Sequence, residues 1–290
     1  SPYGLAFNID GTKMFVSGAS GDDVNEYTLS TGFDVSSASF VDSFAVGSQG
    51  TDPSGLTFNA DGTKMFVLDR TNDRSVDQYT LSTGFDVSSA SWAKSFGVYF
   101  LESSPQGLAF NTDGTKMFIV GDNGDDVNEY TLSTGFDVST ASFVDSFSVS
   151  SQETFPSGLA FNADGTKMFI IGKTGDDVNE YTLTTGFDVS TASFTGEVFD
   201  ISSKESTPMG LAFSADGTKM FVMGYGSDKV HEYTLATGFD LNKRTLTGTY
   251  GQLTLNANGS YTYVANQSAA DDLDAGDTAT DAFNYTLSDG

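Results

Sequence analysis

Hydrophobic and polar positions along this chain recur with a period of about 51 residues. A glycine followed by a leucine or its equivalent marks each copy, and the steps between these glycines are 51, 52, 51 and 52 residues: Gly4, Gly55, Gly107, Gly158 and Gly210. A fixed period of this size is typical of repeat proteins, in which each unit buries its hydrophobic face against its neighbours. The pattern therefore predicts five structural units of one kind.

Each unit contains four short strand-like segments and no segment with helical periodicity. In the third copy these segments are 107–110, 116–120, 126–132 and 142–149. The turn between the first two reads Asn-x-Asp-Gly-Thr, which favours a hairpin because glycine tolerates a positive φ. The repeated aspartate of this turn is expected to shape the turn. Four antiparallel strands per unit predict an all-β fold, a β-propeller of five visible four-stranded blades. Stacked sandwiches need longer units, and a β-helix has a shorter rung.

The segment around each hairpin resembles a known family. Asp-Gly-Thr-Lys-Met-Phe-Val, as in residues 61–67, is similar to the repeat of YVTN-type and lactonase-like β-propellers. The resemblance covers residues 1 to about 240 and implies blades that begin near 1, 53, 105, 156 and 208. Such propellers include enzymes, binding modules and scaffolds, so the resemblance implies a fold and not an activity. Residues 1–245 are assigned to the propeller.

The fifth copy departs from the others after Phe239. Five blades could close alone, or six to eight could close with further repeats. The missing fourth strand is expected from upstream sequence or from residues 241–255. Residues 246–290 resemble the second half of a VCBS repeat, a cadherin-like module of bacterial adhesins, on the strings 251–255, 256–263, 273–276 and 283–290. A partial module at one end, and a start within a blade, predict a fragment of a longer protein.

Charge narrows the possible partners. The chain has 13 Lys and Arg against 39 Asp and Glu, a net charge of −26, and no cysteine. Such a surface repels nucleic acids and anionic lipid head groups. No apolar run of 18 residues is present, so no direct membrane insertion is expected. The composition favours an extracellular or cell-surface location, with a cell-surface glycan or protein as partner.

Few residues suit catalysis. His231 is the single histidine, so a catalytic triad or a histidine metal centre is not expected. The resemblance implies that active propellers place histidine or acidic residues at the central channel, where the first strands here offer Leu, Ala, Thr and Phe. We therefore expect no enzyme, but a binding or scaffold module of an adhesin-type surface protein. The alternatives are a structural protein of a virion or filament, and a propeller hydrolase or lyase with acidic residues at the channel mouth.

Differences between the copies are concentrated in two loops, the one between the second and third strands and the one after the fourth. Alternation of strand direction places both loops on one face, which we expect to be the recognition face. The alternative is that these two loops differ between the copies only through neutral drift. The candidate ligand-binding residues are Arg70, Asn72, Asp73, Arg74, Tyr99, Asp122, Asn123, Lys173 and Tyr225. Trp92 aligns with phenylalanines of the other copies and is expected in the core.

Three further sets of residues carry predictions. No cofactor is certain, but acidic runs suit calcium, which prefers oxygen ligands, and the candidate ligands are Asp272, Asp274 and Asp277. The alternative is that these acidic runs form solvated turns.

The repeated lysine after each hairpin turn is expected to pair with a repeated glutamate, as Lys13 with Glu26. The repeated phenylalanine of Gly-Phe-Asp is expected to fill the gaps between blades.

Overall fold

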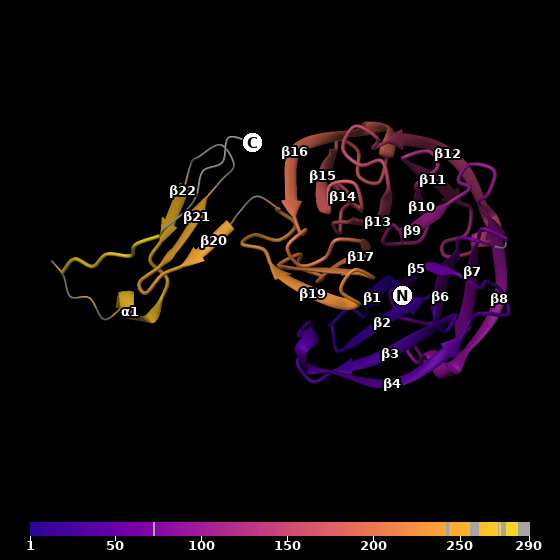
Figure 1. Ribbon diagram of the computed structural model, residues 1–290, viewed down its shortest axis with the longest axis horizontal. Coiled ribbons are helices and arrows are strands. Elements are labelled where there is room, and N and C mark those ends of the chain that lie inside the picture. Colours follow the sequence, from indigo (N-terminus) through magenta and orange to yellow (C-terminus); the bar gives the residue numbers. More distant parts are fainter. Residues whose placement is uncertain (72, 242–243, 256–260, 272, 274–276, 284–290) are drawn as a thin grey trace.

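Five antiparallel sheets, one per repeat, surround a central axis, as predicted (Figure 1). The computed structural model describes residues 1–71, 73–241, 244–255, 261–271, 273 and 277–283. Blades one to four each have four strands in sequence order from the axis outward. Their strands are β1 (Pro2–Phe7), β2 (Lys13–Gly18), β3 (Asp23–Leu29), β4 (Ala38–Ala45), β5 (Pro53–Phe58), β6 (Lys64–Asp69), β7 (Ser75–Leu81), β8 (Ala90–Gly97), β9 (Pro105–Phe110), β10 (Lys116–Gly121), β11 (Asp126–Leu132), β12 (Ala141–Ser148), β13 (Pro156–Phe161), β14 (Lys167–Gly172), β15 (Asp177–Leu183) and β16 (Ala192–Asp200).

The Asn-x-Asp-Gly-Thr turn joins the first two strands of a blade by local hydrogen bonds. In blade one the Asp10 carboxylate accepts the backbone N–H and hydroxyl of Thr12 at 3.0 and 2.6 Å. Gly11 adopts a φ of 70°, and a Cβ there would lie 2.3 Å from the Phe33 ring. The aspartate therefore shapes the turn, as predicted, and the glycine is required both by its φ and by the phenylalanine packed over it.

The ring closes with five blades. The lysine that begins each second strand donates a hydrogen bond to the carbonyl of the Gly-Phe-Asp phenylalanine in the next blade, as Lys13 does to Phe85. In blade five the bond returns to blade one, because Lys219 Nζ lies 2.8 Å from the Phe33 carbonyl oxygen. The same lysines contact the predicted glutamates at 2.6–2.8 Å in blades one, three, four and five. The predicted lysine–glutamate pairing is thus confirmed.

Aromatic side chains fill the space between blades, as expected. Phe85 of blade two stacks on Phe15 of blade one, with ring centroids 6.1 Å apart, and also contacts Phe58 at 5.4 Å. A one-turn 3₁₀ helix follows each such phenylalanine in blades one to four, and the aspartate before it accepts a backbone N–H, as Asp34 does from Ser36. These helices are η1 (Val35–Ser37), η2 (Val87–Ser89), η3 (Val138–Thr140) and η4 (Val189–Thr191).

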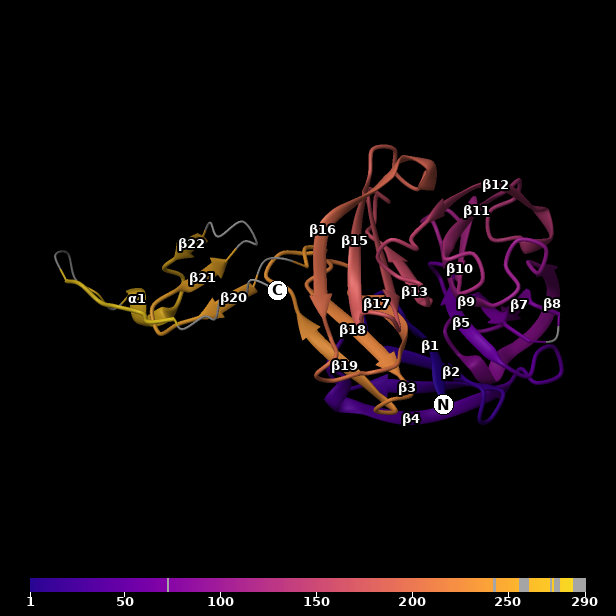
Figure 2. The ribbon, with the colours of Figure 1, turned by 45° about the horizontal axis from the view of Figure 1, so that its top comes forward.

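Blade five has three described strands, β17 (Pro208–Phe213), β18 (Lys219–Gly224) and β19 (Lys229–Thr234). The expectation that residues 241–255 supply its outer strand is wrong. The described part of that segment instead forms β20 (Arg244–Thr247) and β21 (Gln252–Leu255). These strands and β22 (Tyr261–Val264) make a separate antiparallel sheet, and α1 (Ser268–Asp271) follows. Figures 1 and 2 both show this sheet outside the ring. The predicted hairpin turn at 256–260 lies outside the described residues.

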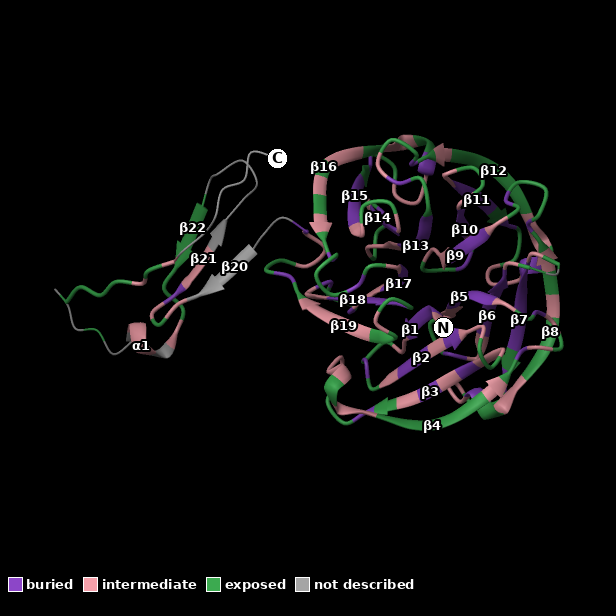
Figure 3. Cartoon of the chain, viewed as in Figure 1, coloured by how far each residue is buried: buried purple, intermediate pink, exposed green. Residues whose placement is uncertain are grey.

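The outermost strands face solvent, whereas the second strands are buried on both sides (Figure 3). Trp92 lies on β8, an outermost strand, and is 49% exposed, so the expectation that it belongs to the core is wrong. Its aligned phenylalanines Phe40 and Phe143 are also exposed. An apolar residue in a strand usually faces the core, but on these outermost strands it lies on the outside of the ring, where no further strand covers it. In the described part of the chain, no helix is long and apolar enough to span a membrane.

One buried carboxylate in blade two is predicted to cost stability. Burial raises the pKa of Asp77 to about 6, and nearby Asp69 adds to the shift. Because the pKa of Asp77 is raised in the folded protein, its contribution to the free energy of unfolding is fully present below pH 3.8 and is lost as the pH rises through about 6. The other four-stranded blades carry asparagine here: Asn25, Asn128 and Asn179. We expect Asp77→Asn to raise the free energy of unfolding at pH 8 by on the order of 2 kcal/mol.

Denaturant unfolding of both proteins at pH 8 and pH 4 checks this. At pH 4 the Asp77 carboxyl is largely protonated and resembles the amide, so the two proteins should unfold alike. An equal gain at both pH values, or no gain at pH 8, would contradict the assignment of the cost to the buried charge.

Candidate functional site

The two variable loops of each blade lie on one face of the ring, as predicted. Hydrogen bonds connect the loop after a fourth strand to the loop after the next second strand. Arg70 Nε, for example, lies 2.6 Å from the Asp52 carboxylate, and the Thr154 and Thr174 hydroxyls lie 2.7 Å apart. The opposite face carries the repeated hairpin turns. One face is therefore uniform and the other differs from blade to blade.

One position of the repeat carries a different chemical group in every blade. It is the residue that directly follows the second strand, and its members are Ala19, Arg70, Asp122, Lys173 and Tyr225. In blades two, three and four its backbone N–H donates to the chain that leads into the blade's first strand, at 3.2–3.3 Å. This shared backbone geometry places an acid and two cations at equivalent points around the central axis, and Tyr225 follows the second strand of blade five at the same position of the repeat. We call the resulting opening the channel mouth.

Side chains from three blades form a connected network at the channel mouth. Arg70 donates to Asp52 at 2.6 Å, to the Tyr3 hydroxyl at 2.8 Å and to Gln106 Oε1 at 3.4 Å. Its guanidinium also lies 4.2 Å from the Tyr3 ring centroid. Gln106 Nε2 donates to Asp122 Oδ2 at 3.4 Å. The network thus runs from blade one through blade two to the carboxylate of blade three.

The remaining two blades complete the mouth with aromatic and cationic groups. The rings of Tyr3 and Tyr225 meet edge to face with centroids 6.0 Å apart. Lys173 Nζ lies 5.8 Å from the Tyr225 ring centroid. Within the described residues, no carboxylate lies within salt-bridge distance of Lys173. Lys173 is therefore a cation at the mouth whose ammonium hydrogens are free to meet a ligand.

The charges at the mouth influence one another. Burial lowers the pKa of Lys173 and the positive charge of Arg70 lowers it further, while Asp122 and Glu153 act in the opposite direction. Burial also disfavours the charge of Arg70, but its hydrogen bond and ion pair with Asp52 outweigh this, so its pKa is raised. Asp52 Oδ1 is buried and has no hydrogen-bond partner among the described residues. The mouth thus holds one firmly charged arginine and one lysine that loses its proton more readily than usual.

Below the mouth, five leucines narrow the channel: Leu5, Leu56, Leu108, Leu159 and Leu211. The space around them is about 30 Å³, and an apolar funnel of about 320 Å³ opens on the uniform face. Each first strand has glycine just before this leucine, and a Cβ on Gly107 would lie 2.9 Å from the Gly158 Cα. The first strands pack too closely for a ligand to pass. A ligand at the mouth would therefore rest on this constriction.

Only part of the predicted set converges on the mouth. Arg70, Asp122, Lys173 and Tyr225 do. Tyr99 instead stacks on Phe100, with centroids 3.8 Å apart, in an exposed loop. The others lie apart: Asp73 is exposed, Arg74 has a φ of 46° just before β7, and Asn123 donates to Ser103. Asn72, Asp272 and Asp274 lie outside the described residues, and Asp277 is exposed.

Tyr3, Asp52 and Gln106 were not predicted from the sequence. A signal was present, because the second residue of each first strand also changes from blade to blade: Tyr3, Ser54, Gln106, Ser157 and Met209. The expectation that the first strands offer only apolar residues to the channel considered the later positions of each strand. Over the described part of the chain, no group of three or more His, Asp or Glu is arranged to hold a metal. The calcium site stays a prediction.

Buried carboxylates hold the loops of this face. Glu153 is fully buried and accepts the backbone N–H groups of Phe155 and Thr174 at 2.7 and 3.0 Å. Glu102 and Glu205 occupy the same position in other blades. In blade two that position is Gly50, and Asp69 on the facing strand end accepts the equivalent N–H groups of Asp52 and Thr71, both at 3.0 Å. In each of these four loop pairs one carboxylate holds the two loops together. The loop after the fourth strand supplies it in three pairs, and the end of the second strand supplies it in the pair of Gly50 and Asp69.

Solved structures similar to this chain share its propeller fold. A chain of a nidogen/laminin complex aligns with a TM-score of 0.50 and 12% identity, over 90% of this chain and 78% of that chain. A putative 6-phosphogluconolactonase from Bacteroides uniformis aligns at 0.49 and 11%, over 92% and 81%. The periplasmic gluconolactonase of Pseudomonas aeruginosa aligns at 0.47 and 16%, over 89% and 79%. No protein-family model and no curated protein matches the sequence.

These comparisons correct two predictions. A non-enzymatic adhesin-type binding or scaffold module, and the absence of enzymatic activity, are both contradicted by the lactonases among the similar structures. The predicted similarity to lactonase-like propellers is supported at the level of the fold. At these identities the likeness establishes the fold, so the chemistry has to be argued from the channel mouth itself.

Proposed function

We propose that this chain is a propeller hydrolase that opens small, uncharged lactones or esters at the channel mouth. The observation that carries the proposal is the single variable position after each second strand. It brings the Asp122 carboxylate, the Lys173 ammonium and the Tyr225 ring around one opening on an otherwise repetitive scaffold. A carboxylate beside a partly buried cation is the pairing that hydrolysis of a carbonyl compound requires.

Each group has a role in the proposed reaction. Lys173 binds the carbonyl oxygen and stabilises the negative charge that forms on it when water attacks the carbonyl carbon. Asp122 accepts a proton from the attacking water and returns it to the ring oxygen when the C–O bond breaks. Gln106 positions Asp122 through its hydrogen bond of 3.4 Å. Arg70 is engaged by Asp52 and Tyr3, and so shapes the wall of the site.

The surroundings favour an uncharged substrate. Asp52, Asp122, Glu102 and Glu153 lie at or just behind the mouth, and the chain has a net charge of −26. A phosphorylated or carboxylated substrate would be repelled by this field. Tyr3 and Tyr225 offer ring faces and edges against which a hydroxylated ring can pack. We therefore assign the substrate class as small hydroxylated lactones or esters.

Proton release measured at constant pH with a panel of such lactones and esters tests the proposal. The wild-type protein should exceed spontaneous hydrolysis for at least one compound. Asp122→Asn should lower kcat/KM by roughly 100-fold or more, and Lys173→Met by a similar factor. Because the protonated lysine is the active form, activity should fall as the pH rises through the lowered pKa of Lys173.

Matched controls make the same chemical changes away from the mouth. Asp145→Asn lies on outer strand β12 of the same blade, and Lys204→Met lies in the exposed loop after β16. Both should retain the wild-type rate. No rate above the spontaneous one with any compound, or full activity of Asp122→Asn, would show that the mouth is not a hydrolase site.

Two further predictions remain proposals beside this one. The acidic composition supports an extracellular or cell-surface location. The order of motifs in residues 246–290 supports a VCBS-like identity for the tail, of which the described part forms the sheet β20–β22. Neither is needed for the proposed reaction.

A further inference from the structure

The funnel on the uniform face is a pocket to which all five blades contribute. The first strands β1, β5, β9, β13 and β17 surround it (Figure 1), and its lining runs from leucines at the inner end through small side chains to phenylalanines nearer the uniform face. Its volume of about 320 Å³ is that of a small-molecule site. Because the leucine constriction closes its inner end, a ligand can enter from the uniform face alone.

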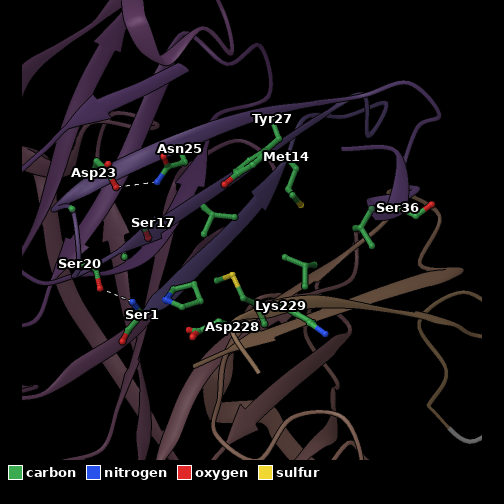
Figure 4. A pocket seen from close by; sticks show the side chains of 17 residues that line it. Ser1, Met14, Ser17, Ser20, Asp23, Asn25, Tyr27, Ser36, Asp228 and Lys229 are labelled. Carbon is green, nitrogen blue, oxygen red and sulfur yellow. Dashed lines mark hydrogen bonds between the residues drawn. The ribbon is translucent and has the colours of Figure 1, made fainter. Parts of the chain in front are cut away.

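The funnel differs from a second cavity, of about 600 Å³, between blade one and blade five. That cavity lies between Met14 of blade one and Lys229 of blade five (Figure 4). It is at the junction where the sequence leads us to expect the missing fourth strand of blade five. The lining of the funnel comes from first strands, hairpin turns and two Gly-Phe-Asp phenylalanines, so it is complete without that strand.

The inside of the funnel is apolar. All residues that line it are described, and none of them is charged. Its asparagines are engaged within their own turns: Asn8 Oδ1 accepts the Lys13 N–H at 2.9 Å, and Asn8 Nδ2 donates to the Thr12 hydroxyl at 3.1 Å. Asn59 makes the same two bonds in blade two. The part of a ligand that enters the funnel is therefore expected to be apolar.

The entrance of the funnel lies between the hairpin turns of blades one, two and five. The turns of blades three and four are joined to each other, because Thr112 Oγ1 donates to the Ala163 carbonyl at 3.1 Å, and neither residue lines the funnel. Three residues of the other turns do line it, and each directly precedes the aspartate of its turn: Ile9 before Asp10, Ala60 before Asp61 and Ala215 before Asp216. Three carboxylates therefore stand at the entrance.

These three aspartates carry a negative charge at neutral pH. A hydrogen bond from the hydroxyl of the threonine two positions later lowers the pKa of Asp10 and of Asp61, and one from the Ser214 hydroxyl lowers the pKa of Asp216. In each, Oδ1 accepts the hydrogen bonds, and within the described residues Oδ2 accepts none. The lysines of this face, one per blade, are held by phenylalanine carbonyls. The entrance therefore attracts a positive charge.

Aromatic rings line the funnel between its apolar inner end and these carboxylates. They are Phe7, Phe33, Phe58, Phe85, Phe110 and Phe213. The faces of such rings carry a partial negative charge and attract ammonium groups, quaternary ones in particular. Apolar inner end, aromatic wall and acidic entrance thus follow one another along the axis.

We propose that the funnel binds a small organic cation, an ammonium group attached to an apolar body. The body rests on the leucines and alanines, and the ammonium group lies among the phenylalanine rings and the three carboxylates. This site is on the face opposite to the channel mouth and is separated from it by the leucine constriction. The inference is therefore independent of the proposed hydrolase activity.

An isoleucine at the entrance allows a direct test with phenyltrimethylammonium. The chain has five isoleucines, of which Ile9 lines the funnel and is 64% exposed, whereas the other four are fully buried. In NMR spectra of protein labelled at the isoleucine δ1 methyl groups, we expect the Ile9 signal to shift saturably as the probe is added. Tetramethylammonium lacks the apolar body and tert-butylbenzene lacks the charge, so each should bind at least about fivefold more weakly.

Two lysine substitutions at one position of the repeat provide the matched control. Ala60 and Ala163 are both exposed and occupy the same place in the hairpin turn, but only Ala60 lines the funnel. Ala60→Lys should weaken binding of phenyltrimethylammonium at least about fivefold, whereas Ala163→Lys should change it less than about twofold.

Four results would overturn the proposal. An unchanged Ile9 signal would show that the funnel does not bind the probe. Equal weakening by the two lysine variants, or equal binding of tetramethylammonium, would show that the cation is attracted only by the charge of the whole chain. Equal binding of tert-butylbenzene would make the occupant an uncharged apolar molecule.

Discussion

Gly172→Asp is expected to destabilise the protein strongly, and adding Glu153→Gly is expected to restore most of the loss. Either change alone disturbs the carboxylate that joins the two loops of blade four. A Cβ on Gly172 would lie 2.2 Å from Glu153 Cδ, so an aspartate there would force two carboxylates into one buried site. Glu153→Gly alone would leave the N–H groups of Phe155 and Thr174 without their acceptor.

The double variant reproduces an arrangement that the chain already contains. Gly50 and Asp69 of blade two are the counterparts of Glu153 and Gly172, and a Cβ on Gly50 would lie 2.1 Å from Asp69 Oδ2. Each single change should lower the free energy of unfolding by about 3 kcal/mol, since an unsatisfied buried donor costs about 1–3 kcal/mol. The double variant should lose less than half of the sum.

Urea unfolding of the four proteins measures this coupling as a double-mutant cycle. A coupling energy of at least about 3 kcal/mol is expected, which is at the upper end of the range for residues in contact. Additive losses would mean that the loops of blade four do not depend on one shared carboxylate. The glycine–aspartate arrangement of blade two would then not be able to replace the glutamate–glycine arrangement of blade four.

The second large effect is expected at the junction between blades three and four. Glu129 is buried, binds Lys116 at 2.7 Å and accepts the Val189 N–H at 3.0 Å. Glu129→Ala would leave the Val189 N–H without its acceptor and the Lys116 ammonium with only the Phe187 carbonyl oxygen. Removing one partner of a buried ion pair typically costs about 3–5 kcal/mol, and we expect a loss of that size.

Blade two supplies the matched control for this change. There Gln78 stands in place of the glutamate and accepts the Val138 N–H at 3.2 Å, while Lys64 donates to the Phe136 carbonyl at 2.8 Å. Glu129→Gln should therefore cost only about 1 kcal/mol. Denaturant unfolding of the two variants distinguishes charge from shape. Equal losses would show that the ion pair, and not the hydrogen bond to Val189, determines the stability of the junction.

The fold could be predicted from the sequence because the same pattern of strands and turns recurs in five copies. The turn around Asp10 and Gly11 depends on contacts between near neighbours in the chain, and such contacts are visible in a sequence. The assignment of Trp92 failed because the two faces of an outermost strand differ only in what covers them. That depends on the position of the whole blade in the ring.

The site was predicted only in part for a different reason. Arg70, Asp122, Lys173 and Tyr225 could be found because they vary at one position of a regular repeat. Their meeting with Tyr3, Asp52 and Gln106 joins residues up to 222 positions apart, as between Tyr225 and Tyr3. The sequence shows that such residues differ between copies, but the contact follows from the closure of the ring.

Closure also has a consequence for how the chain is made. The hydrogen bond between Lys219 and Phe33 joins residues 186 positions apart. Translation at about 5–20 residues per second would separate their synthesis by on the order of 10–40 s. During that interval Phe7 and Phe33, which later pack on Phe221, have no partner from blade five. The first blade to be synthesised is thus the last to be covered, and its exposed face is where a nascent chain would be most prone to aggregate.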